Sequence, residues 1–139
     1  TAETNEKWIT GLRGKIKTGA QFIQTQLCYD MDIVRGYAEL LEEKGFSEHL
    51  FVLIGNGPLL SAKSAIWMRD NLWGVAMPDS VIQRLEDADD PKAEGIKLCV
   101  DQMQEMADIP GISGVHLMAP INTSSIPGVI AAAGINNRS

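Results

Sequence analysis

Features that would assign this chain to several common classes of protein are absent or scarce. Its 139 residues include only two cysteines, Cys28 and Cys99, without metal-ligand spacing. No basic run occurs and the net charge is −6, so nucleic acids and anionic membranes are poor candidates for partners. No apolar stretch approaches the roughly 20 residues that span a bilayer. Residues 1–7 are polar and acidic, unlike a signal peptide. Isolated cysteines in an acidic chain suit the cytosol, so we predict a cytoplasmic protein.

Motifs of several common catalytic and ligand-binding sites are also missing. The sequence has no Gly-x-Ser-x-Gly elbow, no Gly-x-Gly-x-x-Gly fingerprint and no P-loop. His49 and His116 have no Cys, Asp or Glu at ligand spacing, so we expect no metal site. The acidic segment 86–90 lacks the central glycine and the closing glutamate of a calcium loop.

What the sequence does contain is an alternation of predicted strands and helices. Mostly apolar segments at 21–26, 49–55 and 114–118 are typical of strands in parallel sheets. Helical spacing and helix-start signals predict helices at 5–18, at 32–44, at about 61–72, from Pro78-Asp79, from Asp90-Pro91, and from Ser124 or Ser125 to Gly134. This order predicts a single α/β segment over residues 1–139 with a parallel sheet. Three strands are few, so the segment is either a small open α/β domain or part of a (βα)8 barrel.

The helix that begins at Asp90-Pro91 has clear local signals. Asp90 suits the N-cap and Pro91 suits the first helical position. The residues predicted to line one face of this helix are Ile96, Val100, Met103 and Ala107.

Polar residues lie where a ligand of a parallel α/β fold would be expected. Thr25 and Gln26 end the first predicted strand, and binding groups tend to lie at that end. The Gln26 amide can donate and accept hydrogen bonds, which suits a heterocyclic ring edge; alternatively, both residues cap the next helix or satisfy loop backbone. Lys15 either complements a helix C-terminus or contacts a phosphate. The segment 55–57, Gly-Asn-Gly, either cradles an anion or is only a turn.

The chain resembles the methylenetetrahydrofolate reductases from about Leu12 to Ile135. The similar pieces are, in order, Lys15-x-x-x-Gly19-Ala20, Thr25-Gln26 with Asp30, a strand leading to Gly55 and Pro58, Met77-Pro78, Gly95-Ile96, and Gly111-x-x-Gly114-Val-His116 with Asn122 six residues on. These pieces together are much more specific than any one of them.

The resemblance implies a flavoprotein of one-carbon metabolism and methionine biosynthesis. Such an enzyme reduces 5,10-methylenetetrahydrofolate to 5-methyltetrahydrofolate, with FAD passing a hydride from NAD(P)H. The implied fold is a TIM (βα)8 barrel, and these parallel βα units would form its C-terminal part. By position, Lys15 matches the lysine that contacts FAD phosphate, and Gln26 matches the glutamine that touches folate and nicotinamide. Ser64 and Met68 fall where folate-contacting side chains lie.

Several departures from the family pattern limit what this segment would do alone. The family's general acid, a glutamate, and the aspartate that holds the pterin have no counterpart here, so we assign no catalytic residue. The family's Asn-Arg becomes Asn122-Thr123, and the helix before Lys15 reads Trp8-Ile-Thr-Gly11, which leaves the FAD contacts of that helix open. We therefore expect a fragment, or a half that pairs with the remaining half of the barrel or a second subunit, without tight FAD binding alone. The alternatives are a non-catalytic folate-binding or assembly module and a flavin-independent, folate-dependent demethylase.

Overall fold

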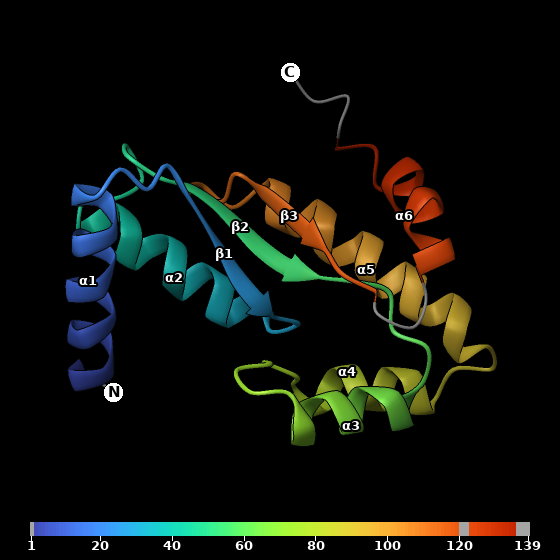
Figure 1. Ribbon diagram of the computed structural model, residues 1–139. Helices are drawn as coiled ribbons and strands as arrows, with labels where there is room; N and C mark the ends of the chain where they lie inside the picture. Colours follow the sequence, from blue (N-terminus) through green and yellow to red (C-terminus); the bar gives the residue numbers. More distant parts are fainter. Residues whose placement is uncertain (1, 120–122, 136–139) are drawn as a thin grey trace.

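The computed structural model describes residues 2–119 and 123–135, with side chains described from residue 7 onward. Its centre is a parallel sheet of three strands in the order β1-β2-β3 (Figure 1). The strands are β1 (Phe22–Leu27), β2 (Phe51–Asn56) and β3 (Gly114–Leu117). The predicted α/β class and the parallel strand direction are confirmed, and within the described residues the sheet is open.

The helices lie close to where the sequence predicted them. They are α1 (Ala2–Lys17), α2 (Met31–Glu43), α3 (Ala62–Asn71), α4 (Asp79–Glu86), α5 (Pro91–Ala107) and α6 (Ile126–Ala133), the last preceded by a 3-10 turn, η1 (Thr123–Ser125). The Asp90 carboxylate accepts from the N–H of Ala93, which confirms the predicted N-cap of α5. None of the described helices is both long enough and apolar enough to cross a membrane.

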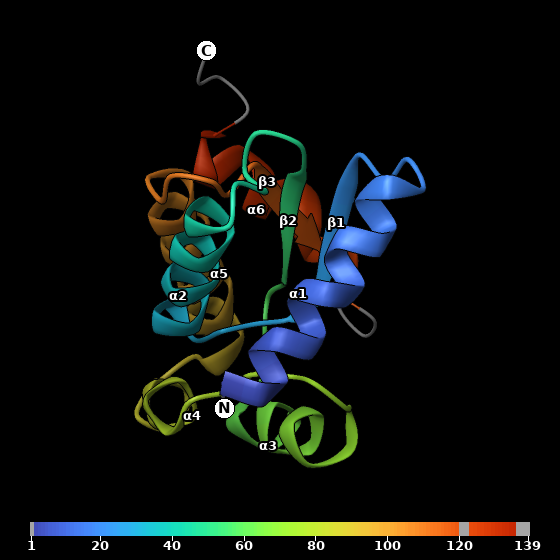
Figure 2. The same ribbon diagram turned by 90° about the vertical axis from the view of Figure 1, so that its left-hand side faces the viewer.

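One face of the sheet is covered by helices. Ile23, Val52 and Ile54 point to this face and pack with residues of α1, α2 and α5. Figure 2 shows α2 and α5 together on one side of the strands. Val52 and Ile54 are each only 1% exposed. Burial of branched apolar side chains between sheet and helices is therefore the main source of stability here.

The opposite face of the sheet is open. Phe22 and Phe51 are register partners on β1 and β2, and they remain 56% and 66% exposed. Gln24 is also exposed, while Leu53 and His116 are half-buried. Since strand side chains alternate between faces, these residues lie opposite the helix-covered core.

The predicted inward face of α5 was partly wrong. Ala107 is exposed and Ile96 and Val100 are only half-buried. The buried residues are Gly95, Leu98, Cys99, Gln102, Met103 and Met106. A Cβ on Gly95 would lie 1.8 Å from the carbonyl oxygen of Leu59, so the helix turns its glycine toward that backbone. Gln102 is buried because its amide has hydrogen-bond partners there.

Candidate functional site

Thr25 and Gln26 lie at an irregularity in the β1–β2 ladder. The register shifts between Gln24 and Leu27. The Thr25 hydroxyl accepts from the N–H of Gly55 at 3.0 Å and donates to the carbonyl oxygen of Gln26 at 2.8 Å. A Cβ on Gly55 would come within 2.9 Å of the Gln26 carbonyl group. A glycine opposite the irregularity therefore lets the two strands stay close at their C-terminal ends.

The Gln26 side chain is exposed and bonded to nearby backbone. Its Oε1 accepts from the N–H of Leu27 at 2.9 Å, and its Nε2 donates to the carbonyl oxygen of Trp73 at 3.3 Å. A primary amide can donate two hydrogen bonds and accept two. Two bonds to the described backbone therefore leave one donor and one acceptor position for a ligand.

Lys15 and Gln26 line the same hollow. This hollow has a volume of about 440 Å³ and lies between α1, β1, α2 and the segment 73–76. Besides Lys15, its polar lining comes from Gln24, Thr25 and Gln26, and aromatic rings come from Trp8, Tyr37 and Trp73. Lys15 is in the last turn of α1, as expected for a lysine that complements a helix C-terminus. The structure thus brings together the two residues predicted for cofactor and substrate.

Ser64 and Met68 line a second hollow that shares no residue with the first. It holds about 60 Å³ and is lined mainly by apolar side chains, with Trp67 and Met118 among them. The Ser64 hydroxyl accepts from the N–H of Ser61 and donates to the carbonyl oxygen of Ser61 in the capping box of α3. Ser64 therefore has a structural role in addition to the predicted contact with a substrate.

A network of buried amides at the ends of β1 and β2 was not predicted from the sequence. Asn56 is fully buried, and its Nδ2 donates to the carbonyl oxygen of Cys28 at 3.1 Å and to Oε1 of Gln102 at 2.8 Å. The N–H of Gly57 donates to Oδ1 of Asn56 at 2.8 Å. The N–H of Gly55 donates to Thr25. Both glycine N–H groups are thus bonded within the protein, so the anion-cradle interpretation of residues 55–57 was wrong.

Burial makes the Cys28 thiol and the Tyr29 phenol weaker acids than usual. Burial raises the pKa of Cys28, which also lines the Lys15–Gln26 hollow. A hydrogen bond to the Asp30 backbone lowers this pKa, and the nearby Asp30 charge raises it. Burial raises the pKa of Tyr29 well above its usual range. Both groups are therefore protonated at neutral pH, and Tyr29 keeps the proton it donates to the carbonyl oxygen of Gly57.

The remaining predicted positions are distributed over the fold. Trp8 and Gly11 lie in α1, Thr123 lies in η1, and Asn122 is outside the described residues. No group of three His, Cys, Asp or Glu side chains in the described ranges is placed to hold a metal ion.

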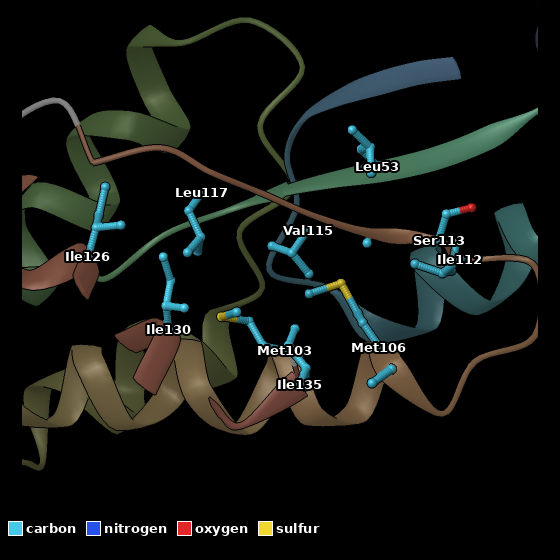
Figure 3. Close-up of a pocket in the computed structure, with 12 residues that line it drawn as sticks. Leu53, Met103, Met106, Ile112, Ser113, Val115, Leu117, Ile126, Ile130 and Ile135 are labelled. Carbon is cyan, nitrogen blue, oxygen red and sulfur yellow. The ribbon is translucent and has the colours of Figure 1, made fainter. Parts of the chain in front are cut away.

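Another hollow, of about 630 Å³, lies apart from all the predicted site residues. It is bordered by β3, α5 and α6, and its labelled side chains are almost all aliphatic or methionine (Figure 3). Ser113 is the polar side chain of this lining, and its hydroxyl accepts from the N–H of Val52. This hollow has no charged side chain in its lining to pair with an anionic cofactor.

Comparison with known proteins agrees with the sequence resemblance. A family model described as methylenetetrahydrofolate reductase matches residues 1–134. A search of curated proteins found no match. The matched range contains every described strand and α-helix, so it includes Lys15, Gln26, Ser64 and Met68.

Proposed function

Because this chain belongs to the methylenetetrahydrofolate reductase family, we propose that it forms part of a flavin-dependent oxidoreductase. The reaction is the reduction of 5,10-methylenetetrahydrofolate to 5-methyltetrahydrofolate with NAD(P)H, in the cytoplasm. The observation that carries the proposal is the hollow beside β1 that Lys15 and Gln26 both line, with Gln26 near the C-terminal end of that strand. Binding groups of parallel α/β proteins gather at that end.

The polar groups of the Lys15–Gln26 hollow fit a ligand with a heterocyclic ring and an anionic group. Gln26 offers one amide donor and one acceptor to the ring edge of a folate. The Lys15 ammonium is exposed in the same hollow, where it would contact a phosphate of FAD. Bound FAD would supply the hydride chemistry, while this chain orients the ligands. One cation is a small share of a dinucleotide site, so the chain alone should bind FAD weakly.

The open sheet face supports the proposal that these strands are one arc of a TIM (βα)8 barrel. Parallel sheets are normally covered on both faces, yet Phe22 and Phe51 remain largely exposed. The apolar hollow beside β3 offers a second surface for packing. We therefore propose that a complementary arc, from the same protein or a second subunit, covers this face and supplies the general acid.

A non-catalytic folate-binding or assembly module is the second candidate, and a flavin-independent, folate-dependent demethylase is the third. The substitutions at Thr123 and in the helix around Trp8 favour the module modestly, because they fall where the family would contact folate and FAD. Flavin content separates the reductase from both of these candidates. Oxidised-flavin absorbance in the protein purified with its complement, bleached by NADH, supports the reductase. Colourless protein that binds tetrahydrofolate supports the module or the demethylase.

The Gln26 contact can be tested with a matched glutamine. We expect Gln26→Ala to weaken tetrahydrofolate binding about tenfold, because one or two hydrogen bonds to the ring are lost. Gln83→Ala, on α4 and outside the hollow, should leave the affinity unchanged. Titration calorimetry measures both. Equal affinities for the wild type and Gln26→Ala would show that Gln26 does not contact the folate.

A further inference from the structure

The buried amides at the ends of β1 and β2 form one continuous chain of hydrogen bonds. Asn56 connects β2 to the carbonyl oxygen of Cys28 and to Gln102 of α5. The Gln102 Nε2 then donates to the carbonyl oxygen of Tyr29 at 2.8 Å. The Tyr29 hydroxyl donates to the carbonyl oxygen of Gly57 at 3.0 Å, which returns the chain to the end of β2.

This network engages the two residues that directly follow β1. The carbonyl oxygens of two consecutive residues, Cys28 and Tyr29, accept from two different amides. Asn56 is 0% exposed and Gln102 is 8% exposed, so water has little access to replace either bond. A buried polar group that loses its partner carries the full cost of its desolvation. Any shift of the turn at Cys28–Tyr29 therefore leaves buried groups unpaired.

The segment after β2 has equally little room to move. A Cβ on Gly57 would lie 1.9 Å from the carbonyl oxygen of Met118, so the end of β3 touches the Gly57 backbone. The ends of all three strands thus meet at the Asn56–Gln102 pair, and Gln26 lies two residues before Cys28 on β1.

We propose that Asn56 and Gln102 are positioning residues, which hold the end of β1 so that the Gln26 amide faces its ligand. The inference rests on the proposed function for the role of Gln26. Neither residue lines the Lys15–Gln26 hollow. They act through the backbone of Cys28 and Tyr29. The residue just before this backbone, Leu27, donates its N–H to Gln26 Oε1.

Amide hydrogen exchange on the whole protein tests the positioning without any ligand. The N–H groups of Leu27, Cys28 and Tyr29 all donate within the protein, so their exchange reports opening of this segment. We expect Gln102→Leu to speed exchange at these three amides about tenfold relative to the amides of β2. Met103→Ala, a buried neighbour on α5 outside the network, is the control for a general loss of stability. Equal local exchange in the two variants would overturn the inference.

A double-mutant cycle on tetrahydrofolate affinity tests whether the effect acts through Gln26. We expect Gln102→Leu to weaken binding several-fold in the wild type but not in the Gln26→Ala background. An equal loss in both backgrounds would overturn the inference. If Gln26→Ala itself leaves affinity unchanged while exchange near Cys28 still rises in Gln102→Leu, the proposed function fails and the positioning of β1 stands.

A milder variant covers the case in which Gln102→Leu does not fold. Tyr29→Phe removes only the hydroxyl that donates to Gly57. We expect faster exchange at the N–H of Gly57, which donates to Asn56 Oδ1, with the β2 amides unchanged. No change at Gly57 relative to wild type would overturn the claim that the network holds this end of the sheet.

Discussion

The two faces of the sheet are built from alternate residues of the same strands, yet they differ sharply in burial. On the covered face, Val52 and Ile54 of β2 are almost fully buried against three helices. On the open face, Phe51 of the same strand is 66% exposed. The covered face therefore supplies the stability of this segment. The open face carries the largely exposed rings of Phe22 and Phe51.

The comparison also separates what local folding needs from what function needs. The side chains of the covered face pack against described residues, and the Asn56 amide finds its hydrogen-bond partners among them too. Phe22 and Phe51 on the open face, in contrast, leave a large apolar area in water. Since exposed patches of this kind mark interaction sites, the open face is where a complementary arc would change the properties of the protein.

The largest effect is expected from truncating the covered face. Ile54→Ala should lower the free energy of unfolding by about 2–5 kcal/mol, because it leaves a cavity among residues that cannot fully collapse. Phe51→Ala, three residues earlier on the open face, should cost less than about 1 kcal/mol in the isolated chain. Urea denaturation monitored by circular dichroism measures both. Similar losses for the two variants would show that the open face is already covered in solution.

Local sequence signals predicted most of the fold because the forces behind them are local. Asp90 and Pro91 start α5 through capping and a fixed backbone angle, and both act within one turn. The apolar run of β2 likewise indicated a buried strand. The inward face of α5 was missed because Gly95 and Gln102 are buried by contacts with Leu59 and Asn56, far away in the sequence. Hydrophobic periodicity counts neither a glycine nor a paired glutamine.

The candidate site shows the same limit. The predicted strand at 21–26 correctly put Gln26 near the end of β1, and Lys15 lines the same hollow, while their contacts with folate and FAD stay predictions. The role of Asn56 was not foreseen, because a Gly-Asn-Gly segment looks like a turn until its tertiary partners are known. The partners of Asn56, Cys28 and Gln102, lie 28 and 46 residues away. No window of local sequence contains that information.

A charge placed on the open face should weaken association with the complementary arc without lowering the stability of the isolated chain further than Phe51→Ala does. We expect Phe51→Asp to weaken binding of the complementary arc by roughly 2 kcal/mol, because a carboxylate would be buried without a partner. The isolated variant should keep the stability of Phe51→Ala. Phe51→Leu, which preserves apolar surface, should still associate. Gel filtration of each variant with its complement measures the effect. A wild-type chain that stays a compact, stable monomer in the presence of that complement would contradict the half-barrel proposal.

The smallest effect near neutral pH is a pH dependence that comes from the helix-covered side, where Cys99 of α5 is fully buried beside Met103 and Val129. Burial raises the pKa of Cys99 from 9.0 to about 12. Above the lower value the unfolded thiol loses its proton while the folded thiol keeps it, so the unfolded state binds fewer protons and the free energy of unfolding falls as pH rises. The stabilisation is complete below the unfolded pKa and should decline by up to about 1.4 kcal/mol per pH unit above it. Cys28 and Tyr29, whose pKa values are also raised, add to the same slope.

The contribution of Cys99 can be isolated by mutation. Cys99→Ala should be less stable at neutral pH but lose less stability on alkaline titration. Urea denaturation of both proteins at several pH values above neutrality measures the difference, and parallel curves would show that the Cys99 thiol reaches solvent.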